Sequence, residues 1–151
     1  LDTGMMNYFL GIQTEILGTD DLNRIHQGTI IEHLVGQEIL AQQFNPLSSL
    51  NFWTREKKTA LAEVDYVFPF EGQLIPIEVK AGKDGSLKSL HIFMDQAPHD
   101  MAIRFYAGEF QLTTTTTAEG KSYRLLNLPY YLASQTKEYI AWLKNEARQP
   151  R

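Results

Sequence analysis

The chain has 151 residues, 43% of them hydrophobic, which is enough for one domain with a hydrophobic core and too short to expect two. It has no cysteine, which excludes disulfide bonds and thiolate metal sites and fits a reducing cytoplasm. No apolar run reaches the roughly 18 residues of a transmembrane helix, so no membrane span is expected. With 18 acidic and 14 basic residues the net charge is -4, which argues mildly against a general nucleic-acid binder.

Two helices are predicted in the N-terminal third. The first is short, at residues 5–10, after the turn signal Asp2-Thr3-Gly4. Because the chain starts at Leu1 without a charged and then apolar leader, we interpret it as a fragment of a longer protein rather than a secreted precursor. The second helix is long, at residues 22–44, capped by Asp20 or Asp21 and ended by Asn45-Pro46. Its apolar residues recur at helical spacing: Ile25, Ile30, Ile31, Leu34, Val35, Ile39 and Leu40.

Strands and two further helices follow. Residues 50–55 read as a strand, and residues 62–68 and 74–80 read as an antiparallel hairpin joined by Glu71-Gly72. In this hairpin Val64, Tyr66 and Phe68 are expected to take the apolar face of the first strand, and Ile75, Ile77 and Val79 are expected to face the core from the second. Ser86 is expected to cap the next helix, which runs through Met94. Strands at residues 101–106, 110–117 and 122–126 and a helix at 129–147 complete the order. This order predicts an α/β fold, a mixed β-sheet flanked by helices.

Charged residues of the predicted hairpin carry the clearest chemistry. Asp65 lies on one strand, and Glu78 and Lys80 lie two apart on its neighbour, so the three can gather on one sheet face. Two carboxylates could hold a divalent metal through oxygen ligands. The lysine could orient a water molecule or offset charge that develops on a phosphate. The pattern is typical of a metal-dependent phosphodiesterase.

Glu32 of the long helix is a fourth candidate. It lies between two pairs of aliphatic residues, near the stripe predicted to be buried, where an unpaired carboxylate costs desolvation free energy. Its partner could be Lys80, or a metal shared with Asp65 and Glu78. Glu38 is a weaker candidate for the same role.

Each of these signals has a plainer interpretation. Glu78 and Lys80 could be an ordinary ion pair on a solvated sheet face, because short acidic patterns arise often by accident. None of the four histidines is assigned chemistry, since they share no ligand spacing. Gly120-Lys121-Ser122 imitates the end of a phosphate-binding loop, but Thr115 stands where that loop needs glycine, so no ATP site is expected.

The chain also carries an ordered set of short segments, which are residues 1–5, 8–11, 28–32, 52–55, 63–65, 76–80, Ser89-Leu90 (or Ser86-Leu87) and 128–132. Taken in order, they resemble the uncharacterised domain that follows the AAA-type ATPase module in many bacterial and archaeal ATPases. The resemblance is strongest from Asp65 to Lys80 and extends over nearly the whole chain. That family is regarded as a branch of the restriction-endonuclease-like, or PD-(D/E)XK, fold.

The resemblance implies a restriction-endonuclease-like core over residues 21–151, with residues 1–20 as the tail of the preceding region. It implies Asp65 and Glu78 as ligands of Mg²⁺ or Mn²⁺ and Lys80 as the catalytic lysine. Glu32 would be the helix acid that completes or braces the site and its metal. Val64 stands where the family pattern has proline.

Two functions are therefore expected as alternatives. The first is a DNA-directed module of an AAA-type ATPase, in the cytoplasm, that hydrolyses phosphodiesters with Mg²⁺ or Mn²⁺. The second is a non-catalytic recognition or regulatory module that keeps the fold. In that case Glu32, Asp65, Glu78 and Lys80 would form a semi-buried ion network.

Overall fold

The structure, a computed structural model, describes Met5 and residues 23–43, 48–57 and 60–146. Two predictions lie outside the described residues. They concern residues 6–10 of the short first helix, and Asp20 or Asp21 as the cap of the long second helix. No helix in the described part combines the length and apolar character needed to cross a bilayer. The elements are α2 (Asn23–Ala41), β1 (Trp53–Lys57), β2 (Ala60–Val64), β3 (Tyr66–Phe70), β4 (Gln73–Val79), α3 (Lys88–Gln96), β5 (Met101–Tyr106), β6 (Gln111–Thr116), β7 (Ser122–Pro129), the 3-10 helix η2 (Tyr130–Gln135) and α4 (Thr136–Glu146).

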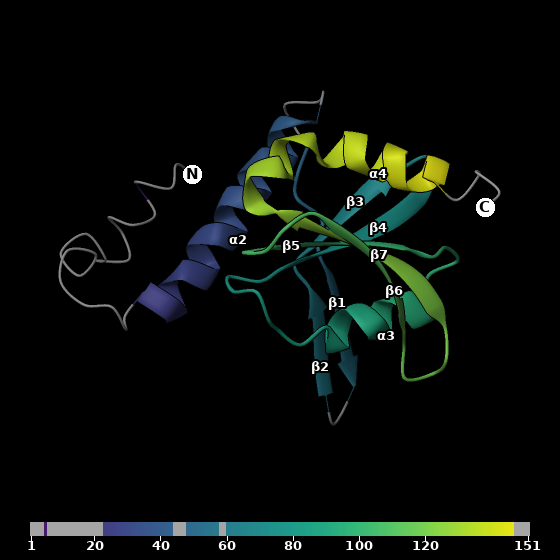
Figure 1. The fold of residues 1–151 in the computed structure, drawn as a ribbon. Helices are drawn as coiled ribbons and strands as arrows, with labels where there is room; N and C mark the ends of the chain where they lie inside the picture. The colour runs from purple at the N-terminus through teal and green to yellow at the C-terminus, as the bar shows by residue number, and fades with distance from the viewer. Residues whose placement is uncertain (1–4, 6–22, 44–47, 58–59, 147–151) are drawn as a thin grey trace.

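The strands form a five-stranded sheet in the order β3-β4-β5-β7-β6 and a separate two-stranded ribbon, β1-β2. β4, β5 and β7 pair in parallel, and β3 and β6 pair antiparallel at the two edges. α2, η2 and α4 lie on one side of this sheet and α3 lies on the other (Figure 1). The prediction of a mixed sheet flanked by helices is confirmed.

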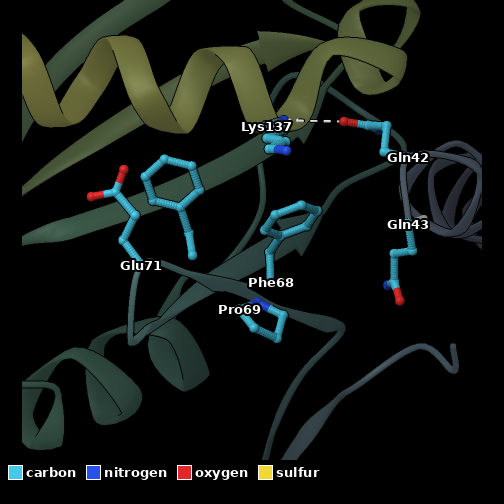
Figure 2. A pocket seen from close by; sticks show the side chains of 7 residues that line it. Gln42, Gln43, Phe68, Pro69, Glu71 and Lys137 are labelled. Carbon is cyan, nitrogen blue, oxygen red and sulfur yellow. Dashed lines mark hydrogen bonds between the residues drawn. The ribbon is translucent and has the colours of Figure 1, made fainter. Parts of the chain in front are cut away.

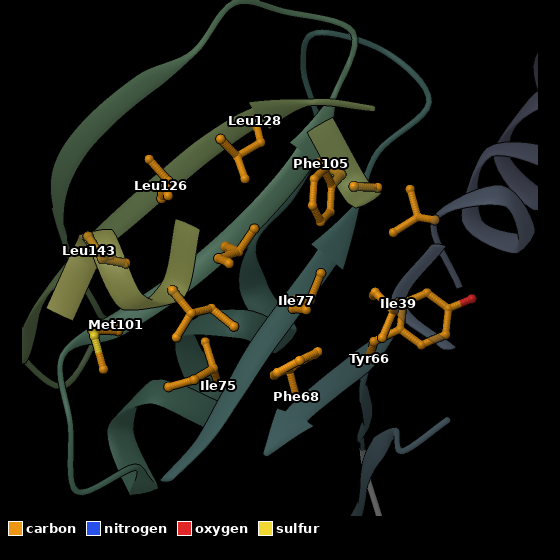
Figure 3. Close-up of a cluster of buried hydrophobic side chains, with 14 of the residues drawn as sticks. Ile39, Tyr66, Phe68, Ile75, Ile77, Met101, Phe105, Leu126, Leu128 and Leu143 are labelled. Carbon is orange, nitrogen blue, oxygen red and sulfur yellow. The ribbon is translucent and has the colours of Figure 1, made fainter. Parts of the chain in front are cut away.

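Both faces of the central strands are buried, because helices cover both. On the α4 side, Ile75, Ile77 and Val79 of β4 pack with residues of β5, β7, α2 and α4 in the larger cluster (Figure 3). This confirms the prediction that these three residues face the core. On the α3 side, a smaller cluster joins Leu90, Phe93 and Met94 of α3 to the opposite face.

The prediction of a single strand at residues 62–68 was wrong, because this segment belongs to two strands, β2 and β3. Asp65 lies at a bend between β2 and β3, and these strands belong to different sheets. Val64 therefore packs in the cluster under α3, whereas Tyr66 and Phe68 pack in the cluster under α4. A strand's alternation holds only while it stays in one sheet, and the bend breaks it. The three residues do not share one apolar face as predicted.

Other boundaries differ less. The prediction for β5 is confirmed at both ends, whereas the closing helix begins with the 3-10 turn η2 before α4. α3 starts one residue later than expected, with Leu87 in the capping position. Ser86 Oγ still accepts a hydrogen bond from the Lys88 backbone N–H, at 3.3 Å.

A close contact between α2 and β3 fixes the helix against the hairpin. The Tyr66 hydroxyl donates a hydrogen bond to the backbone oxygen of Glu32, at 2.9 Å. Gly36 makes room for it, because a Cβ at this position would lie 2.5 Å from the Tyr66 hydroxyl oxygen. The contact holds the helix that carries Glu32 beside the strand that follows Asp65.

Substituting Gly36 with alanine is expected to lower the free energy of unfolding by about 1–3 kcal/mol, because the added methyl overpacks the Tyr66 ring. Gly28→Ala is the matched control on the same helix, where an added Cβ meets nothing within 4 Å. That control should gain up to about 1 kcal/mol from better helix propensity. Urea unfolding of both variants measures the difference; equal stabilisation in both would contradict the packing argument.

Candidate functional site

The β3-β4 hairpin brings Asp65 and Glu78 opposite each other. Tyr66 pairs with Ile77, so the residues just outside this pair, Asp65 and Glu78, are across from one another. The Val79 backbone N–H donates a hydrogen bond to Asp65 Oδ2, at 2.7 Å. This bond orients the Asp65 carboxylate toward β4 at the point where its own strand bends.

Glu78 is the most deeply buried acid of the site, with 3% of the residue exposed. Its Oε1 lies 2.5 Å from Lys80 Nζ, whereas its Oε2 is buried without a hydrogen-bond partner. Burial and the neighbouring charge of Asp65 raise the pKa of Glu78 to about 7, although the bond from Lys80 opposes the shift. At neutral pH the attraction of Lys80 therefore does not fully offset the cost of burying the negative charge of Glu78.

Two more acids contribute to the negative potential around Lys80. Burial raises the pKa of Asp65, against the lowering effects of the Val79 N–H and of Lys80. Glu32 is exposed on α2, yet partial burial of its carboxyl raises its pKa, and the charges of Asp65 and Glu63 add to the shift. The positive charge of Lys80 opposes both shifts. Glu32 was expected near the buried stripe of the helix, but the residue is exposed and interacts with Asp65 and Lys80 through its charge.

The three predicted acids do not converge into a complete metal-binding set. Among the described residues, no group of three or more histidine, aspartate or glutamate side chains is placed to hold a metal ion. The geometry leaves a pair, Asp65 and Glu78, with one unused oxygen on Glu78. Glu32 is close enough to interact through its charge but does not form a third member of that group.

Residues 27–131 match the sequence profile of the family described as a domain of unknown function, DUF4143. The chain belongs to the DUF4143 family. All four candidate residues lie inside the matched region. The family description names no activity. No curated protein and no solved structure matches the chain.

Lys80 of this DUF4143 chain is held along its whole length. Its backbone N–H donates to the Phe105 oxygen at 2.9 Å, and its own carbonyl accepts from the Tyr130 hydroxyl at 2.5 Å. The loop after β4 crosses its aliphatic stem, because a Cβ on Gly85 would lie 2.7 Å from Lys80 Cδ. The side chain is 27% exposed, so it is held by these contacts and still partly accessible.

Sequence reasoning missed one charged residue beside the candidate site of this DUF4143 chain. Arg104 of β5 pairs with Glu78 of β4, directly beside it in the sheet. The available signal was a charged residue in the middle of the apolar strand at residues 101–106, since such a position is buried on both faces in a central strand. Pairing between β4 and β5 was not predictable from either strand alone.

The DUF4143 fold also has a pocket away from these acids. It has a volume of about 400 Å³ and lies between the end of α2, the edge strand β3 and the start of α4 (Figure 2). Gln42 at its rim accepts a hydrogen bond from the Lys137 backbone N–H at 3.1 Å and donates one to the Ala133 oxygen at 2.8 Å. The side-chain amide of Gln42 thus joins the end of α2 to η2 and α4. None of the four candidate residues lines this pocket. The lining residues are Gln42, Gln43, Phe68, Pro69, Phe70, Glu71 and Lys137.

Proposed function

We propose that this DUF4143 chain is a nuclease-like module that holds Mg²⁺ or Mn²⁺ between Asp65 and Glu78 and hydrolyses phosphodiester bonds of DNA. The observation that carries the proposal is the Glu78 carboxylate. It is buried, it lies across from a second carboxylate, and one of its oxygens is unpaired. Burying a charged group in this state costs free energy unless a cation compensates it.

The donor set fits a hard divalent cation. Mg²⁺ is commonly bound through only one or two carboxylates, with water and substrate phosphate oxygens as its other ligands. Asp65 and Glu78 supply that number, and a bound cation would relieve their mutual repulsion. Glu32 is proposed to brace the site through its charge, since the described geometry leaves it outside a three-acid group.

Each residue has a distinct role in this proposal. The cation would supply Lewis-acid polarisation of the phosphodiester. Lys80, fixed by Glu78 and by the loop at Gly85, would position the attacking water and offset the negative charge that develops on the phosphate. Glu78 would thus serve both as a ligand and as the residue that orients the lysine.

A restriction-endonuclease-like core is part of the proposal. An antiparallel hairpin carries the acids, and a helix then leads to a parallel strand beside it, which supports this assignment. By the sequence resemblance, the chain would work in the cytoplasm beside an AAA-type ATPase module. ATP hydrolysis would then lie outside these residues.

The experiment is a plasmid-nicking assay of the chain in Mg²⁺ and in Mn²⁺, with Glu78→Ala and Lys80→Ala measured in parallel. Nicking by the parent chain that both substitutions abolish supports the proposal. Nicking that survives both substitutions assigns the activity to another site or to a contaminant and contradicts it.

A second function is favoured by one specific observation. Lys80 Nζ already lies 2.5 Å from Glu78 Oε1. In a site that no longer binds metal, this ion pair would itself neutralise the charge of Glu78. Under this alternative the chain is a non-catalytic recognition or regulatory module. Calorimetry with Mn²⁺ separates the two functions, because the alternative requires no binding that depends on Asp65 and Glu78.

A further inference from the structure

A polar row crosses the sheet beside the candidate site. Arg104 of β5 pairs with Glu78 of β4 on one side and with Asn127 of β7 on the other. Residues in register on neighbouring strands point to the same face of a sheet, and adjacent strands lie about 4.8 Å apart. The backbone of Arg104 is therefore one strand away from that of Glu78, and its side chain leaves the same face.

Arg104 has unused hydrogen-bonding capacity. Its Nε is buried and has no hydrogen-bond partner, and the ion pairs found among the described residues do not include it. Arg104 as a whole residue is only half-buried. A guanidinium that no carboxylate neutralises has its donors free for an anionic ligand.

The guanidinium group is also held in place. Its central carbon lies 4.4 Å from the centroid of the Tyr106 ring, a stacked cation–π arrangement. The ring is fixed in turn, because the Tyr106 hydroxyl donates to the Glu109 backbone oxygen at 2.7 Å. Gly108 packs directly against it, since a Cβ there would lie 2.2 Å from ring carbons. The contact with the Tyr106 ring orients the planar guanidinium group of Arg104 before a ligand binds, which lowers the entropic cost of binding.

A pocket adjoins this platform. It has a volume of about 360 Å³, and its lining includes Tyr106 and Lys83, which belongs to the loop that follows Lys80. Lys83 is exposed there. Glu109 also lines this pocket, and its negative charge opposes anion binding. Lys83 is the positively charged lining residue, and Arg104 adjoins the pocket through its contact with Tyr106.

We propose that Arg104, stacked on Tyr106, binds a phosphodiester group of a nucleic-acid strand next to the group at Lys80. The inference deepens the proposed function and rests on it for the nature of the ligand. Arginine suits this role because its planar fork donates two parallel hydrogen bonds to phosphate oxygens. Arg104 would be a substrate-binding residue that sets the path of the strand across the site.

The test is fluorescence anisotropy with a fluorescein-labelled DNA single strand and with RNA of the same sequence, in Mg²⁺ and in EDTA at several salt concentrations. Arg104→Ala is expected to weaken binding on the order of 10-fold, the effect of losing a charge-assisted hydrogen bond. The slope of log affinity against log salt should fall by about 0.7, as for one lost phosphate contact to a single strand. Arg104→Lys should keep that slope, because its charge remains, and lose part of the affinity with the fork.

Arg55→Ala is the matched control, because it removes the same charge from β1, in the two-stranded ribbon. It should leave both affinity and slope nearly unchanged. Equal weakening by both alanine variants, unchanged binding in Arg104→Ala, or no binding of either strand by the parent chain would overturn the inference. If melting shows that Arg104→Ala does not fold, the comparison of Arg104→Lys with the parent decides.

The outcomes also separate this inference from the proposed hydrolysis. If nucleic-acid binding depends on Arg104 but the chain does not nick DNA, the inferred binding site is supported and the proposed nuclease activity is rejected. Nicking that depends on Lys80, together with unchanged strand binding in Arg104→Ala, would keep the nuclease and reject the role of Arg104. Tight binding of only one of the two strands would assign the phosphodiester to DNA or to RNA and support the inference.

Discussion

Replacing Lys80 with alanine is expected to lower the rate of metal-dependent plasmid nicking by about 100- to 1,000-fold, the usual cost of removing one group that stabilises developing charge. The Lys80 side chain is 27% exposed and makes its ion pair with Glu78 alone, so the fold should survive its removal. Cation binding should also survive, because Asp65 and Glu78 remain. Loss of the rate with retained binding of Mn²⁺ would identify Lys80 as a residue that acts on the substrate.

Lys144→Ala is the control for this experiment. Lys144 pairs with Glu71 at 2.5 Å and lies on α4, across the sheet from α3. Its loss removes one positive charge and its ion pair with Glu71 at the far end of the hairpin, without touching Asp65 or Glu78, and nicking should continue at the parent rate. A parent rate in Lys80→Ala, or a comparable loss in both variants, would show that the lysine has no specific role.

Glu78→Gln is expected to raise the stability of the metal-free chain at neutral and alkaline pH. The Glu78 carboxyl has its pKa raised from 4.5 to about 7 in the folded state. Between these values the folded state holds a proton that the unfolded state has lost, so stability falls as the pH rises through this window. A shift of this size corresponds to about 3 kcal/mol. Glutamine has the same shape and no charge, so the variant should lack this loss.

The measurement is urea unfolding of both proteins in EDTA at two pH values. At about pH 4 Glu78 is largely protonated in both the folded and the unfolded state, and at about pH 8 the full cost of burying its charge is present. The two proteins should be close in stability in acid and differ at the higher pH, with the variant more stable by up to about 3 kcal/mol. Glu63→Gln, an exposed acid on β2, is the control and should change little. Adding Mn²⁺ should then stabilise the parent and leave Glu78→Gln nearly unaffected.

The opposite result has an equally clear meaning. If Glu78→Gln is less stable than the parent at the higher pH, the ion pair with Lys80 stabilises the fold more than burial of the carboxylate costs. The site would then be a structural ion network, in keeping with the non-catalytic module. This experiment therefore decides between the two functions without any assay of activity.

Much of the local structure could be predicted from the sequence. The alternation of β4 placed Ile75, Ile77 and Val79 in the core and put Glu78 on the opposite face, and the helical spacing of α2 gave its extent to within a few residues. These features are local, because side-chain periodicity depends only on the geometry of a single element. Asp65 and Glu78 were singled out for the same reason, since spacing along one hairpin determines which residues lie across from each other.

The tertiary structure decided what surrounds those residues. The bend at Asp65 depends on β2 pairing with β1 while β3 pairs with β4, and no pattern within residues 62–68 encodes two partners. The placement of Arg104 beside Glu78 depends on parallel pairing of strands that are separated by α3. The raised pKa of Glu78 depends on burial and on the approach of Asp65. Periodicity determined which residues could act, whereas long-range strand pairing and desolvation, which arise only when the chain is packed, determined their charge and their neighbours.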